Sequence, residues 1–184
     1  MTAPVDRWRE VAELFRARLS LVEHDQWTAV TPCADWDVRA LVDHAVGYQW
    51  AYLNALDSNT AADAAGPDDD PVASWATVHA ALAAAYERPD VLESSFDFLT
   101  PIVPGTIAAQ IVVPLADLLI HTWDLSRAID TDESLPEETC DFVLAAMRDV
   151  EHLIRIPEWY GEAIEPPPSA SPVVQLMSFT GRPV

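Results

Sequence analysis

Apolar side chains recur every three or four residues along most of this sequence, which is the spacing of a helix that buries one face. The first such run places Val5, Trp8, Val11, Phe15 and Leu19 on one stripe. The periodicity predicts helices over residues 4–23, 38–56, 72–88, 107–128 and 134–155, and a short one over 173–180. Only 89–105, with three prolines and several β-favouring residues, leaves room for a short strand. We therefore expect an all-α fold, a helical bundle with a long connection and a C-terminal strap.

Proline, aspartate and glycine mark where these helices begin, bend and end. Asp35 or Asp37 suits the N-cap of the second helix, because a carboxylate there accepts a bond from a free backbone N–H. Pro114 removes one backbone hydrogen bond, so it should kink or restart the fourth helix. Pro136 fits the first turn of the fifth helix, which we expect to begin at residue 134 or 135. Gly181 fits a left-handed cap after the last helix.

A chain of 184 residues is long enough for one domain with a substantial core. We expect residues 1–184 to form a single domain with two irregular segments inside it. The first is an acidic linker over 57–71, which lacks the ligand spacing of a calcium loop. The second is the strap over 156–184, which should wrap over the bundle.

Charge and composition narrow the class of partner. The sequence has 10 basic and 30 acidic residues, a formal net charge of −20, and such a surface repels nucleic acid and anionic membranes. The first residues lack a basic stretch followed by an apolar one, so we expect no signal peptide. The most apolar stretch, 107–120, is interrupted by Gln110, Pro114 and Asp117. Two cysteines are too few for a disulfide framework, so we expect a cytoplasmic protein with reduced thiols. The sequence leaves open whether it acts alone or as a homodimer.

Two helices carry polar side chains where the pattern demands apolar ones. Asp117 and His121 are four residues apart, so they share one helix face, and that helix is otherwise rich in Leu, Ile and Val. His44 lies on the core-facing stripe of the second helix, between Leu41 and Tyr48. Side chains from facing helices build metal sites inside bundles. Three N/O ligands suit a divalent ion such as zinc and leave one position open.

The same residues have a simpler interpretation. A buried histidine that is hydrogen-bonded to a carboxylate needs no metal, and the spacing alone favours neither interpretation. Asp124 lies seven residues after Asp117 on nearly the same face. It would orient a ligating histidine from the second shell, or else be a surface acid on the last turn.

Five further residues near this region are weaker candidates. Trp36 and Trp123 would wall a substrate pocket or simply pack in the core, while Arg127 and Arg182 would bind a substrate carboxylate. The alternatives for the two arginines are a helix C-terminal cation and an ion pair in the tail. Cys33, just before a helix N-terminus, is a candidate nucleophile for which the sequence shows no evident general base.

Three motifs carry a family resemblance. TPCADWDVRALVDHAVG (31–47) resembles the start of the second helix in the DinB/YfiT-like superfamily and, more narrowly, in the N-terminal domain of mycothiol-dependent maleylpyruvate isomerases. LADLLIHTWDLSRAID (115–130) resembles their second motif, an acid four residues before a His-x-Trp-Asp-Leu run. LMSFTGRPV (176–184) resembles the Gly-Arg ending of a single-domain subgroup.

The resemblance implies a DinB-like four-helix bundle that binds a divalent metal through His44, Asp117 and His121. Zinc is the metal that we expect, with nickel as the alternative. It also implies mycothiol as co-substrate, with an electrophile as the second small molecule. The isomerases continue into a second domain, which we do not expect in this protein, and they typically have Glu at the position of Asp117. The expected function is therefore a metal- and thiol-dependent transferase or isomerase. The alternatives are a non-catalytic helical module and a metal-dependent hydrolase that needs no thiol.

Overall fold

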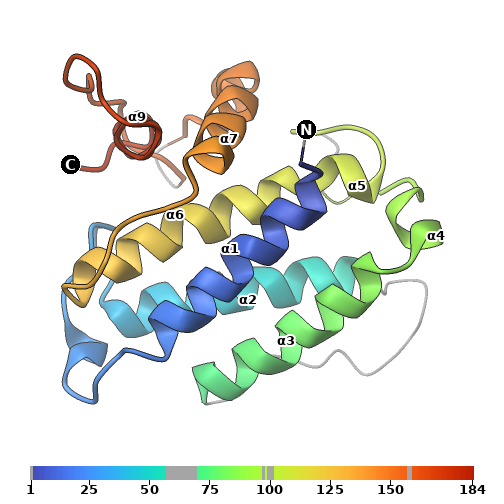
Figure 1. Cartoon of the computed structure of the whole chain (residues 1–184), viewed down its shortest axis with the longest axis horizontal. Helices are drawn as coiled ribbons and strands as arrows, with labels where there is room; N and C mark the ends of the chain where they lie inside the picture. Colours follow the sequence, from blue (N-terminus) through green and yellow to red (C-terminus); the bar gives the residue numbers. More distant parts are fainter. Residues whose placement is uncertain (1, 57–69, 97, 99–101, 157–158) are drawn as a thin grey trace.

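The computed structural model describes residues 2–56, 70–96, 98, 102–156 and 159–184. The core is a bundle of four long helices that lie along one another in Figure 1: α1 (Pro4–Leu19), α2 (Val38–Leu56), α3 (Pro71–Tyr86) and α6 (Val112–Ala128). Short elements connect them: η1 (Gln26–Thr28), α4 (Pro89–Leu92) and α5 (Ile107–Gln110). The described residues include isolated bridges but no strand. The predicted all-α bundle is therefore confirmed.

Helix α6 is the central element of the bundle. It contacts α1, α2 and α7, and thirteen of its residues are buried, so it is apolar on almost every side. With α5 it forms the span Ile107–Ala128, which is long and apolar enough to cross a membrane by length and composition. The span is 72% buried, as expected of the core helix of a bundle. Any polar side chain on α6 must therefore find its partners inside the protein.

The last third of the described chain packs beside this bundle. Helices α7 (Glu137–Asp149) and α9 (Pro172–Phe179) lie together above α6 in Figure 1, and α8 (Glu151–Ile154) follows α7 directly. Ser171 caps α9 through its hydroxyl, which accepts from the Val174 N–H. The backbone at Gly181 then takes the positive φ of 81° that the sequence predicts for a left-handed cap. This turn sends the C-terminal residues back toward α6.

Prolines and side-chain hydrogen bonds decide where the predicted helices differ from the observed ones. The first helix ends at Leu19 rather than near residue 23, because the Ser20 hydroxyl donates to the Ala17 carbonyl and the chain turns. The third ends at Tyr86, since Arg88 precedes Pro89 and is extended, with φ −98° and ψ 110°.

The expected interruption near Pro114 is present, because the helix breaks at Ile111 between α5 and α6. The predicted start of the fifth helix at 134 or 135 is wrong. Pro136 is the N-cap rather than a first-turn residue, and α7 begins at Glu137. Ser134 instead donates to Asp132 in a turn before the helix.

Two of the predicted irregular segments have different outcomes. Most of the acidic linker, 57–69, lies outside the described residues, and its end, Asp70, caps α3 by accepting from the Val72 N–H. In 89–105 the structure has α4 and one isolated bridge between Ser95 and Thr106, instead of a strand, among the residues it describes.

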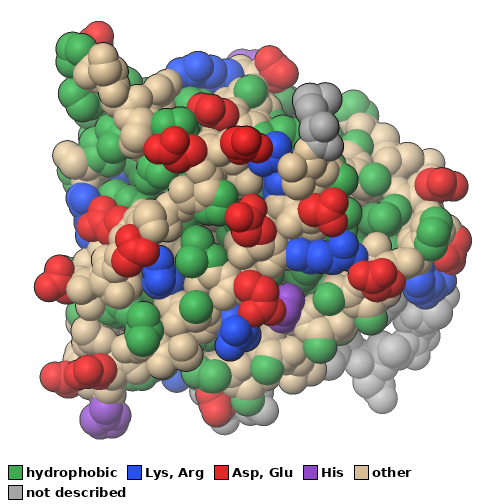
Figure 2. Space-filling view, viewed as in Figure 1, with side chains coloured by type: hydrophobic (Ala, Val, Ile, Leu, Met, Phe, Trp, Pro, Cys, Tyr) green, Lys and Arg blue, Asp and Glu red, His purple; other side chains and the backbone are tan. Residues whose placement is uncertain are grey.

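Acidic side chains (red) are spread among fewer arginines over the face in Figure 2, in keeping with the net charge of −20.

Substitution of Gly181 and of Gly47 by alanine tests the assigned backbone turn at Gly181. A Cβ at Gly181 would come within 2.9 Å of the Glu162 carbonyl oxygen, whereas one at Gly47 in α2 would meet nothing within 4 Å. We expect Gly181→Ala to lower the free energy of unfolding by about 1–3 kcal/mol. Gly47→Ala should raise it by about 0.5–1 kcal/mol. Urea denaturation measures both, and equal effects of the two substitutions would contradict the assigned turn.

Candidate metal centre

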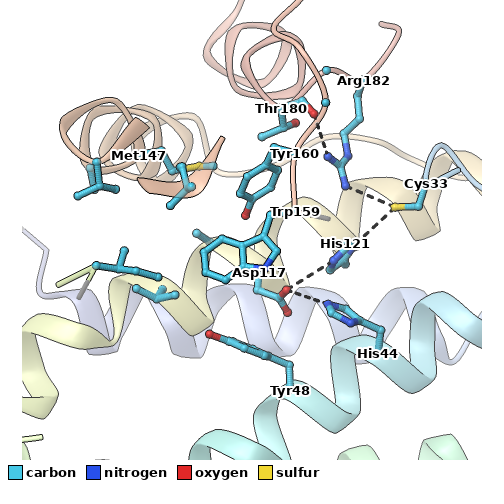
Figure 3. Close-up of a pocket in the computed structure, with 18 of the residues that line it drawn as sticks. Cys33, His44, Tyr48, Asp117, His121, Met147, Trp159, Tyr160, Thr180 and Arg182 are labelled. Carbon is cyan, nitrogen blue, oxygen red and sulfur yellow. Dashed lines mark hydrogen bonds and ion pairs between the residues drawn. The ribbon is translucent and has the colours of Figure 1, made fainter. Parts of the chain in front are cut away.

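Asp117 lies between two histidines that come from different helices. Its Oδ1 is 3.2 Å from Nε2 of His44 on α2 and 3.5 Å from Nε2 of His121, one turn later on α6. Figure 3 shows the carboxylate between the two imidazole rings, whose centroids are 5.0 Å apart. The structure thus brings together the three residues that the sequence singles out.

The packing of α2 against α6 places these side chains at the wall of a cavity. The cavity has a volume of about 760 Å³ and is lined by α2, α6, α7, the loop before α2 and the strap. The side chain of His44 is 37% exposed and that of His121 10%, so the first imidazole faces the cavity openly and the second lies deeper. A small molecule in the cavity can therefore reach the atoms between them.

The spacing of the donor atoms fits a single divalent ion. Zinc binds histidine nitrogen at about 2.0–2.1 Å and carboxylate oxygen at about 2.0–2.2 Å, so two tetrahedral ligands lie about 3.4 Å apart. The observed separations of 3.2 and 3.5 Å match that value. The second carboxylate oxygen, Oδ2 of Asp117, is buried and has no hydrogen-bond partner. A cation bound by both oxygens of Asp117 would satisfy it, whereas the interpretation as a hydrogen-bonded core pair leaves it unpaired.

The other side of the His121 ring faces a second polar group. Nδ1 of His121 is 3.0 Å from Oδ2 of Asp124, which is fully buried. Arg182 donates to both oxygens of Asp124, from Nε and from Nη2, each at 2.7 Å. The Cys33 sulfur lies 3.3 Å from Asp124 Oδ2, 3.4 Å from Arg182 Nη2 and 3.9 Å from His121 Nδ1. His121 therefore belongs to two polar clusters, one on each nitrogen.

Both clusters contain side chains that can ligate a metal, but in one of them the carboxylate is already bound by an arginine. Among the described residues, the candidate ligand groups are His44–Asp117–His121 and Cys33–His121–Asp124. In the second group the guanidinium of Arg182 already occupies both oxygens of Asp124 and places a positive charge beside them. A cation there would be repelled and would have to displace a bidentate ion pair. The geometry favours the first group.

The titration of the centre follows from these contacts. Burial alone would raise the pKa of Asp117, but the charges and hydrogen bonds of His121 and His44 outweigh it and bring the pKa to about 2. Burial also opposes ionisation of Asp124, yet His121 and Arg182 lower its pKa to about 2. Burial would lower the pKa of His121, but Asp117 and then Asp124 and Cys33 raise it well above its usual value. In the metal-free protein, the two carboxylates therefore favour the protonated form of His121.

The weaker candidates separate into two groups. Trp36 lies at the cavity, with its ring centroid 4.6 Å from that of His44, and Arg182 is part of the cavity wall. Trp123 and Arg127 are not brought to the cavity. Trp123 is 2% exposed in the core with Arg127 stacked 4.4 Å from its ring, and Arg127 pairs with Glu133. Arg127 is the helix C-terminal cation of the alternative interpretation.

Sequence reasoning missed several neighbours of the centre. Cys33 has a histidine nitrogen and a carboxylate beside it, two neighbours that the sequence did not indicate. Tyr48 and Tyr160 also line the cavity, and burial first, then the charge of Asp117, raises the pKa of both hydroxyls. Tyr48 follows His44 by one helical turn, which is a usable signal, whereas no periodicity marks Tyr160 in the irregular strap.

Comparison with known proteins agrees with this geometry. A sequence-family model described as "Mycothiol maleylpyruvate isomerase N-terminal domain" matches residues 8–126, from α1 through nearly all of α6. The chain belongs to this family. The family is mycothiol-related and metal-binding, and the matched part contains His44, Asp117 and His121. The strap and Arg182 lie beyond it.

The curated relatives cover the chain more fully. The uncharacterized proteins Rv0738 and MT0763 of Mycobacterium tuberculosis are each 30% identical over 186 residues, which is 98% of this chain and 98% of theirs. The similarity thus extends through the strap. No solved structure gives a significant match.

The two lowered carboxylate pKa values predict how stability depends on pH in the metal-free protein. Asp117 and Asp124 have pKa values of about 2 in the folded chain against an ordinary value of 3.8, so the stability that they contribute is present above that value. It should be lost as pH falls from about 4 toward about 2. Urea unfolding at about pH 5 and about pH 3 measures this loss.

Asp117→Asn is the control for that measurement, because it keeps the shape of the side chain and removes one titrating group. We expect a shallower fall in its free energy of unfolding than in that of the wild type. An equal fall in both proteins would show that Asp117 is not held ionised by the two histidines.

Proposed function

We propose that this protein is a divalent-metal-binding enzyme, a transferase or isomerase, that activates mycothiol at the His44–Asp117–His121 centre. The observation that carries the proposal is the Asp117 carboxylate, whose Oδ1 lies at ligand spacing from two histidine nitrogens and whose buried Oδ2 has no hydrogen-bond partner. Family membership supports both the metal and the thiol. Zinc is the metal that we expect, because two nitrogens and one carboxylate are ligands it commonly takes. We place the protein in the cytoplasm, where a low-molecular-weight thiol stays reduced.

Asp117 and the two histidines line the cavity, so a divalent ion that they held would remain accessible to a further ligand from it. When bound, a divalent metal stabilises the thiolate form of a coordinated thiol, which is the reactive nucleophile and is scarce at neutral pH without such help. Asp117 and the two histidines hold the site, and Asp124 accepts the Nδ1 hydrogen of His121 so that Nε2 faces the ligand position. The proton released from the thiol leaves to solvent through the cavity.

The cavity wall indicates what kind of electrophile fits beside the thiol. Apart from the two histidines of the centre, Arg182 is the only basic residue among the described residues of the wall, and Asp124 already neutralises it. Aromatic and aliphatic side chains, including Trp36, Tyr48 and Met147, form most of the remaining wall. The wall therefore suits a second substrate with an uncharged, apolar body better than a dicarboxylate.

A thiol-conjugation assay tests the proposed function. Mycothiol and the fluorogenic alkyl chloride monochlorobimane should react faster with the zinc-loaded protein than with the metal-free protein. His44→Ala and His121→Ala should each lose at least about tenfold of the accelerated rate, since loss of even an outer partner of a metal ligand typically costs that much.

His152→Ala is the matched control, because it removes an exposed histidine on α8 that is not part of the cavity wall. It should keep the wild-type rate and the wild-type zinc content. If the metal-free and zinc-loaded proteins accelerate the reaction equally, the thiol is not activated at this centre. A protein that binds zinc but hydrolyses substrates without any thiol would instead be the metal-dependent hydrolase.

Zinc binding should also release a proton. The pKa of His121 is raised well above its usual value in the metal-free protein, so the ring is protonated at neutral pH and must lose a proton to ligate. We expect about one proton to be released per zinc near pH 7, and tighter zinc binding as pH rises. Titration calorimetry in buffers of different ionisation enthalpy gives this number. A binding enthalpy that does not depend on the buffer would contradict ligation by His121.

A further inference from the structure

The C-terminal strap contributes a buried cation to the bundle. Arg182 is 8% exposed and Asp124 is fully buried, and the guanidinium meets the carboxylate with two parallel bonds of 2.7 Å. The two residues are 58 positions apart in the chain. A bidentate pair of this kind fixes the plane of the carboxylate as well as its position.

The carboxylate transmits that orientation to a proposed metal ligand. Oδ2 of Asp124 lies 3.0 Å from Nδ1 of His121, and Nε2 on the opposite side of the ring faces Asp117. Because the Nδ1 hydrogen is held by Asp124, the lone pair of the neutral ring is on Nε2, where a metal would bind. Arg182, Asp124 and His121 are therefore linked by consecutive polar contacts from the tail to the centre. Figure 3 shows Arg182 reaching from the tail toward Cys33 and His121.

The backbone of the tail holds Arg182 in this place. The positive φ of Gly181 turns the chain, and a side chain there would collide with the backbone of Gly161 and Glu162. The Arg182 N–H donates to the Met177 carbonyl at 3.0 Å, and the Thr180 hydroxyl donates to the same oxygen at 2.9 Å. The position of the guanidinium is therefore fixed by a hydrogen-bonded backbone turn.

We propose that Arg182 is a positioning residue of the metal centre, which acts through Asp124 to fix the His121 ring for metal binding. The inference rests on the proposed function, because it assumes that His121 is a ligand. It assigns part of the centre to the strap, which lies outside the matched residues 8–126. Arg182 bonds to Asp124 and not to His121, and the carboxylate neutralises its charge. Its removal should therefore weaken the site by disordering the ligand and should bring no gain from reduced repulsion.

The experiment measures zinc affinity by competition with a chromophoric chelator, and the visible spectrum of the cobalt-loaded protein. Arg182→Met removes the charge and both bonds, while Arg182→Lys keeps a charge that cannot bond both oxygens at once in the planar geometry of arginine. We expect Arg182→Met to weaken zinc binding by about 10–100-fold. Arg182→Lys should weaken it less, and the cobalt bands should shift in both variants.

Arg127→Met is the matched control. Arg127 also holds the tail, since its Nη1 donates to the Pro183 carbonyl at 2.8 Å, but its own ion pair is with Glu133, and the charge of Asp124 is the smallest of the influences on its pKa. It should bind zinc with the wild-type affinity and give the wild-type cobalt spectrum. An equal loss in Arg127→Met would show that docking of the tail, and not the guanidinium of Arg182, supports the centre.

The outcomes separate this inference from the proposed function. A wild-type protein that binds no zinc overturns the proposed function itself. A wild-type protein that binds zinc, beside folded Arg182→Met and Arg182→Lys variants of unchanged affinity, overturns only the role of Arg182. If circular dichroism shows that Arg182→Met does not fold, Arg182→Lys decides alone, and an unchanged affinity and cobalt spectrum in that variant overturn the inference.

Discussion

The carboxylate of Asp117 joins two helices of the bundle and imposes a constraint that other parts of the structure must meet. It lies within 3.5 Å of imidazole nitrogens from α2 and α6, on a helix that is buried on almost every side. A buried charge there is costly unless it is paired. Oδ1 has its partners in the two histidines and Oδ2 has none. The proposed divalent cation would supply the missing contact if both oxygens of Asp117 bound it.

Asp124, the second buried acid beside His121, obtains its counter-charge from the C-terminal strap, which is distant in sequence. His121 carries a proton between two acids, and the outer acid, Asp124, is fully buried and needs a counter-charge of its own. Arg182 provides it from the strap, and Gly181 permits the turn that brings the guanidinium to α6. Burial, charge pairing and the tail turn are therefore one connected arrangement, with the cavity on its open side.

Much of this could be predicted from local sequence pattern and some could not. The i, i+4 spacing puts Asp117 and His121 on one face, and the stripe position of His44 points it into the bundle, so both helix packing and the candidate ligands were predictable. Helix ends were less so, because Ser20 and Pro136 act through single hydrogen bonds and dihedral angles. The bond from Arg182 to Asp124 has no periodicity to reveal it, since an irregular strap carries the arginine.

The most direct measurement of the central claim is anomalous diffraction at the zinc absorption edge from a zinc-loaded crystal. The account predicts one peak bonded to Nε2 of His44, the Asp117 carboxylate and Nε2 of His121, with its remaining coordination directed into the cavity. A peak on the other side of the ring, between Cys33, Nδ1 of His121 and Asp124, would contradict it. So would the absence of any peak near His121 in crystals grown with excess zinc.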